Sequence, residues 1–135
     1  MGKQKKKGVE RKEKKVFLEL FYMTPEVVSA KGLSDFFKDW EEILVDFWEE
    51  MEVFEIGMVG LEPVSFEQGG MEFQHPKDQA FLKNRGIKSI FHVTAEKKAF
   101  EDMRAYLEKM VEEFGGFICS DSEDFQPFYM GIQGV

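Results

Sequence analysis

Two histidines and a single cysteine are the residues of this chain whose types could carry chemistry. His75 precedes a proline in an expected loop, whereas His92 lies in an expected strand beside Phe91. Histidines 17 residues apart share a metal ion only if the fold brings them together with further ligands such as a carboxylate. The helical pair at positions i and i+4 of a zinc protease is absent. We therefore predict no metal site and no cofactor.

The cysteine, Cys119, ends an expected strand and precedes the acidic stretch Ser120–Asp124. A nucleophilic thiol needs a lowered pKa, which a helix N-terminus or a cationic neighbour provides. Nearby carboxylates would raise that pKa instead, so the pattern favours a small buried core residue. A lone cysteine also forms no internal disulfide.

The loop after Cys119 contains Asp121, Glu123 and Asp124 and has the most distinctive local composition. Its carboxylates could chelate a hard cation, although the spacing and the central glycine of a calcium loop are missing. They could instead accept hydrogen bonds from a cationic partner, cap backbone groups nearby, or form a solvated turn. No catalytic set is recognisable. The candidate ligand-binding residues are His75, His92, Cys119, Asp121, Glu123 and Asp124.

Hydrophobic periodicity and turn signals predict the elements that position these residues. Strands are expected at 16–23, 53–60, 87–93 and 117–119, with a hairpin over 64–73. Helices are expected from Thr24 to Gly32, at Pro76–Asn84, and from a Thr94 cap to Phe114. The clearest helical pattern runs from Ser34 to Met51, where aromatic and aliphatic residues recur every three or four positions.

Two strand–helix–strand units predict an α+β fold, a ferredoxin-like split βαβ sandwich with a hairpin insert. Right-handed crossovers would place two long amphipathic helices on one face of an antiparallel or mixed sheet. The other face would be closed by the hairpin, by a tail or by a partner, because a large exposed apolar patch normally marks an interface. We therefore expect a dimer or a bound ligand.

The net charge of −8 is divided unequally along the chain. Residues 1–15 contain eight basic and two acidic side chains, whereas residues 16–135 contain 10 basic and 24 acidic ones. This division predicts a flexible basic arm at 1–15 and a single acidic α+β domain at 16–135. Because the domain repels polyanions, we expect nucleic acid to bind weakly at most, through Lys3–Lys15 of the arm.

No apolar run is long enough to span a membrane, and no export signal is recognisable, so we expect a cytoplasmic protein. These features favour a non-enzymatic interaction module that binds a basic protein or a second copy of itself. An inhibitory module such as an immunity protein or antitoxin is the most concrete form of this hypothesis. The alternative is a small-molecule-binding or enzymatic domain with a pocket between the sheet face and the hairpin insert.

Overall fold

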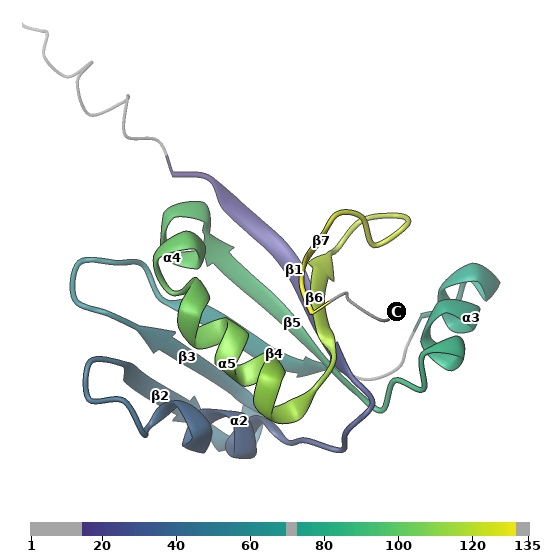
Figure 1. Cartoon of the computed structure of the whole chain (residues 1–135). Helices are drawn as coiled ribbons and strands as arrows, with labels where there is room; N and C mark the ends of the chain where they lie inside the picture. The colour runs from purple at the N-terminus through teal and green to yellow at the C-terminus, as the bar shows by residue number, and fades with distance from the viewer. Residues whose placement is uncertain (1–14, 70–72, 132–135) are drawn as a thin grey trace, which may run out of the picture.

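The computed structural model describes residues 15–69 and 73–131 and contains one seven-stranded sheet (Figure 1). Its strands are β1 (Phe17–Thr24), β2 (Leu44–Trp48), β3 (Val53–Gly57), β4 (Val64–Gly69), β5 (Ser89–Glu96), β6 (Phe117–Ser120) and β7 (Phe128–Met130). Its helices are α2 (Ala30–Phe37), α3 (Pro76–Asn84), α4 (Lys97–Asp102), α5 (Arg104–Phe114) and the short 3₁₀ helix η2 (Glu49–Met51). None of the helices in these two ranges has the length and apolar character that crossing a membrane requires. Apart from Lys15, the predicted basic arm at 1–15 lies outside the described residues.

Helices α2, α4 and α5 lie together on one face of the sheet (Figure 1). They pack on the strand side chains that alternate toward them, because successive residues of a strand point to opposite faces. The main core joins sheet residues such as Leu20, Tyr22, Phe54, Phe66 and Phe91 to helix residues such as Leu33, Phe37, Met103 and Leu107. Burying each such large apolar side chain contributes about 1.5–3 kcal/mol.

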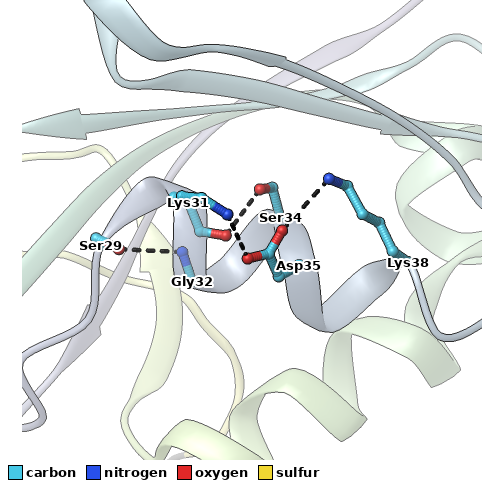
Figure 2. A network of polar contacts seen from close by, with 6 residues as sticks. All are labelled: Ser29, Lys31, Gly32, Ser34, Asp35 and Lys38. Carbon is cyan, nitrogen blue, oxygen red and sulfur yellow. Dashed lines mark hydrogen bonds and ion pairs between the residues drawn. The ribbon is translucent and has the colours of Figure 1, made fainter.

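Helix α2 begins at Ala30 because Ser29 caps it: the Ser29 hydroxyl oxygen accepts a hydrogen bond of 3.0 Å from the Gly32 amide. Figure 2 shows this cap and the Asp35 carboxylate between two lysines, 2.8 Å from Lys31 and 3.3 Å from Lys38. Hydrogen bonds from Lys31 and then Lys38 hold the pKa of Asp35 below its usual range. Gly32 therefore lies inside a helix, and the prediction that it ends one is wrong.

The predicted helix from Ser34 to Met51 is also wrong, because α2 ends at Phe37 and Leu44–Trp48 forms a strand. Tight turn hydrogen bonds follow α2, including 3.4 Å from the Trp40 amide to the Phe37 carbonyl. In β2, Val45 packs toward the core and Leu44 and Trp48 are exposed. When most positions of a segment are apolar, its pattern fits the period of a helix as well as that of a strand. Here pairing with β3 determines that the segment forms a strand.

The ferredoxin-like fold is contradicted, because the sheet has seven strands in the order β2-β3-β4-β5-β1-β6-β7, which is not the arrangement of two βαβ units. Every strand pair is antiparallel, which the prediction of an antiparallel or mixed sheet allowed. Strands β2 to β5 form a meander in which consecutive strands are neighbours. Strand β1 inserts between β5 and β6. The predicted hairpin over 64–73 is wrong as well, since β4 pairs with β3 and β5 and residues 70–72 lie outside the described residues.

The predicted helix from Thr94 to Phe114 starts later and is interrupted. Thr94 is not a cap, because β5 continues to Glu96 along its pairing with β1. Met103 then separates α4 from α5. The backbone therefore turns at Met103, and its fully buried side chain helps to fix both helices to the core.

The end of α5 is closed by side chains of β1. The Tyr22 hydroxyl donates a hydrogen bond of 2.6 Å to the Gly115 carbonyl, and the Thr24 hydroxyl donates one of 2.7 Å to the Phe114 carbonyl. These bonds satisfy carbonyls that a helix terminus leaves without partners. Gly116 has a φ of +87°, and a Cβ there would lie 2.0 Å from the Met23 carbonyl oxygen. Only glycine lets α5 end so close to β1.

Residues of the described ranges cover the second face of the sheet at its β5–β1–β6 end. There Leu82 and Ile87, from α3 and the loop after it, and Phe125 pack against Met23 and Phe117. Helix α3 lies apart from the other helices (Figure 1). Within the described ranges no helix covers this face over β2, β3 and β4, and Leu44 of β2 is 57% exposed there.

Candidate functional site

Each of the five neighbouring strands β2, β3, β4, β5 and β1 contains one carboxylate and no lysine or arginine. Successive side chains of a strand point to opposite faces of the sheet, and the core side chains point to the face that the helices cover. All five carboxylates stand at the alternate positions of their strands, so they lie on the other face. We define the acidic face as these five carboxylates together with Asp121, which follows β6. Its members are Glu19, Asp46, Glu55, Glu67, Glu96 and Asp121.

A continuous polar row crosses the acidic face. Strand register places Asp46 opposite Glu55, Glu55 opposite Ser65, Ser65 opposite Thr94, and Thr94 opposite Glu19. Like charges directly opposite each other destabilise a sheet. The Asp46–Glu55 pair therefore lowers the stability of the fold.

His92 is the only basic side chain that the strands contribute to this face. Its Nε2 lies 3.2 Å from Oε1 of Glu19 and 3.3 Å from Oδ2 of Asp121, and the side chain is 34% exposed. The Thr94 hydroxyl donates a hydrogen bond of 3.2 Å to the same Glu19 oxygen, and the Phe21 ring packs edge-on to the imidazole at 5.6 Å. An imidazole nitrogen beside two carboxylates can exchange a proton with either of them.

The structure brings His92 and Asp121 together, two of the six candidate residues from the sequence. Cys119 lies near them, because Phe21 of β1 is opposite His92 on one side and opposite Cys119 on the other. The thiol is fully buried. Burial, and then the Asp121 carboxylate, raise its pKa to about 12. A thiol that stays protonated near neutral pH is a poor nucleophile, so Cys119 serves the core.

The other three candidates, His75, Glu123 and Asp124, lie outside this group: two of them form hydrogen bonds within their own turns, and the third is exposed. His75 caps α3, and its Nδ1 accepts a hydrogen bond of 3.0 Å from the Lys77 amide. Asp124 accepts one of 3.0 Å from the Gln126 amide, which orders its own turn. Glu123 is exposed to solvent in the same loop. These residues therefore do not extend the His92 cluster.

The hollows found among the described residues lie away from the His92 cluster, which we define as His92, Glu19 and Asp121. In the part of the chain that the structure describes, no three His, Cys, Asp or Glu side chains are arranged to hold a metal ion. One hollow of about 360 Å³ lies between α5 and β7 beside Arg104, and another of about 360 Å³ lies beside α3 at Lys83. Neither is lined by His92, Cys119 or Asp121. The side chains of His92, Glu19 and Asp121 are each partly exposed to solvent.

Exposed apolar side chains border the acidic face. Trp48 is 40% exposed, Phe17 is 50% exposed, and both alternate to the same side of the sheet as the carboxylates. Aromatic side chains of this kind are the usual energetic anchors of protein interfaces. The face therefore combines charge with places where apolar area can be buried.

The sequence candidates omitted all five strand carboxylates of the acidic face, which are Glu19, Asp46, Glu55, Glu67 and Glu96. A signal was present in the sequence, because each of these residues is the single carboxylate of an otherwise apolar or neutral strand. It could not be used for Asp46, since that residue was expected in a helix. The shared face becomes visible only when the five strands are placed side by side.

Comparison with known protein families, curated proteins and solved structures finds no match to this chain. The class of protein is therefore defined by its architecture: an antiparallel sheet with helices on one face and carboxylates on the exposed part of the other.

Proposed function

We propose that this protein is a non-enzymatic interaction module that binds a basic protein through the acidic face. The observation that supports the proposal is the placement of one carboxylate on each of five neighbouring strands, all on the same side, with no lysine or arginine in any of these strands. Complementary charge of this kind speeds association and selects against partners of the wrong sign.

The helix side of the molecule gives a contrast. There Asp35, Asp102 and Glu108 each pair with a lysine or arginine four residues earlier, at 2.8, 2.7 and 3.0 Å. On the acidic face, Asp46 and Glu67 form no ion pair with any residue in the described ranges. Part of the negative charge of the helix side is therefore neutralised locally, whereas Asp46 and Glu67 of the acidic face remain available to a partner.

The shape of the site also favours a protein partner. Small molecules usually bind in concave pockets that bury most of their surface. The acidic face is a stretch of open sheet, and the exposed Trp48 and Leu44 at its β2 edge offer apolar contacts. An inhibitory module of the immunity-protein or antitoxin kind would use such a surface to cover a basic enzyme.

Affinity capture from cells with matched charge variants tests this proposal. One variant neutralises the acidic face (Asp46→Asn, Glu55→Gln, Glu67→Gln), and the control removes the same charge from exposed helix positions (Glu101→Gln, Glu112→Gln, Glu113→Gln). We expect the wild type and the control to capture the same basic protein, identified by mass spectrometry. The face variant should lose it, and higher salt should weaken the capture. Equal capture by all three chains would contradict the proposal.

A small-molecule-binding or enzymatic role is the second candidate, and the His92 cluster favours it. The imidazole between Glu19 and Asp121 could transfer a proton to a bound molecule. His92→Gln separates the two functions, because it removes the proton carrier and leaves the carboxylates in place. Under the first proposal this variant still captures the basic protein, whereas a ligand that depends on His92 no longer binds.

A further inference from the structure

We propose that the basic segment of residues 1–14 binds the acidic face of its own chain and competes there with the basic protein. The inference rests on the proposed function, because both occupants use the same surface. The segment contains seven basic and two acidic side chains, a net charge of +5. Its basic residues are Lys3, Lys5, Lys6, Lys7, Arg11, Lys12 and Lys14.

The first described residues, which directly follow this segment in the sequence, lie beside the acidic face. The Val16 carbonyl accepts a hydrogen bond of 2.7 Å from the Lys97 amide, so backbone pairing beside β5 continues to Val16, next to the first described residue. The Lys15 ammonium forms an ion pair with Glu62, in the loop before β4. Since β5 lies between β1 and β4, Lys15 already reaches across one strand toward the centre of the sheet.

The segment is long enough to cover the whole face. Fourteen residues span up to about 45–50 Å when extended. Strands β1 and β2 are separated by four strand spacings, or about 19 Å. A tethered segment of this length also acts at a high effective concentration, on the order of millimolar for a short flexible connection. The segment can therefore compete with a free partner even if its own contacts are weak.

Charge complementarity favours the acidic face over the helix side as the place where the segment binds. The face presents six carboxylates, and only His92 supplies an ion-pair partner to any of them among the described residues. On the helix side, Asp35, Asp102 and Glu108 are already paired. A basic protein would then bind only if it displaces the segment from the acidic face. This competition would raise the selectivity of the acidic face for its partner.

Paramagnetic relaxation in the full chain tests this inference. Gln4→Cys provides a site for a nitroxide label, and the burial and raised pKa of Cys119 keep that residue unlabelled. We expect the label to broaden the amide signals of Glu55 and Glu67 and to leave those of Glu112 on α5 intact. Addition of salt should restore the broadened signals, since the attraction is electrostatic.

The charge variants described above serve as matched controls for the labelled chain. Broadening should disappear in the face variant and persist in the helix-side control. Broadening of both sides alike, or of α5 alone, would overturn the inference. So would broadening that appears only when labelled and isotope-enriched chains are mixed, because the segment would then occupy a second copy.

The two proposals can fail separately. If the acidic face captures a basic protein but the label broadens none of its signals, the segment does not bind there and the proposed function stands. If the label broadens the face and no protein is captured through it, the proposed function fails and the intramolecular contact stands.

Discussion

Replacing Glu55 with glutamine should stabilise the fold while weakening the binding of a basic partner. Glu55 lies on β3 directly opposite Asp46, and Glu67 on β4 is its diagonal neighbour, because Glu67 pairs with Val53 and Glu55 pairs with Ser65. Removing the central charge therefore relieves two repulsions at once. The direction of the change is unusual, since most substitutions destabilise a protein.

The expected gain follows from the strand geometry. Residues directly opposite have Cβ atoms about 5 Å apart and diagonal ones about 7–8 Å apart. In water, unit charges at those distances repel by about 0.8 and about 0.5 kcal/mol. At physiological ionic strength, screening with a Debye length of about 8 Å reduces the sum to about 0.6 kcal/mol. At low salt it should approach about 1 kcal/mol.

Urea unfolding of the wild type and the Glu55→Gln variant, at low and at physiological salt, measures this gain. Glu101→Gln is the control, because it removes the same charge from α4, where the Glu101 carboxylate interacts favourably with Lys98. A double-mutant cycle with Asp46→Asn should give a coupling of the repulsive sign. The reasoning is refuted if Glu55→Gln lowers the free energy of unfolding, or if its gain does not shrink as salt is added.

Two further predictions concern the core. Gly116→Ala should lower the free energy of unfolding by more than about 2 kcal/mol, because left-handed strain adds to a Cβ placed 2.0 Å from the Met23 carbonyl oxygen. Gly60→Ala, with a φ of +88° and nothing within 4 Å of the new Cβ, should cost about 1 kcal/mol, and equal losses in urea unfolding would contradict this account. Cys119 should resist iodoacetamide at about pH 8 in the folded protein and react once unfolded, as mass spectrometry can show, since burial raises its pKa to about 12. Because the folded pKa lies above the unfolded value of about 9, this thiol should reduce the free energy of unfolding as pH rises from about 9 to 12, and an unchanged slope in Cys119→Ala would argue against it.

Several elements could be predicted because their signals are local. The alternating strand at 16–23 corresponds to β1, and the predicted helix at Pro76–Asn84 is confirmed as α3. The buried position expected for Cys119 is also confirmed. In each case the pattern needs only the nearest residues along the chain, such as a proline at the first helical position.

The segment from Ser34 to Met51 could not be predicted in this way. Its apolar residues are so frequent that a helical stripe can be drawn through them, yet Val45 and Phe47 pack on the core from a strand. The hairpin with β3 buries these side chains and pairs the backbone groups of Leu44–Trp48. Tertiary pairing therefore overrides the local pattern, and the unpredicted strand β2 takes the place of a long helix that the ferredoxin-like arrangement required.

The sequence by itself determined the division of charge and the single carboxylate in each of five apolar or neutral segments. Alternation within one strand follows from local geometry, so each carboxylate could in principle be assigned a side. Only the tertiary structure decided that these five sides coincide, and that His92 meets Glu19 and Asp121, which lie 73 and 29 residues away along the chain. The physical reason is that strand order and register depend on long-range packing of the core, which no local period specifies.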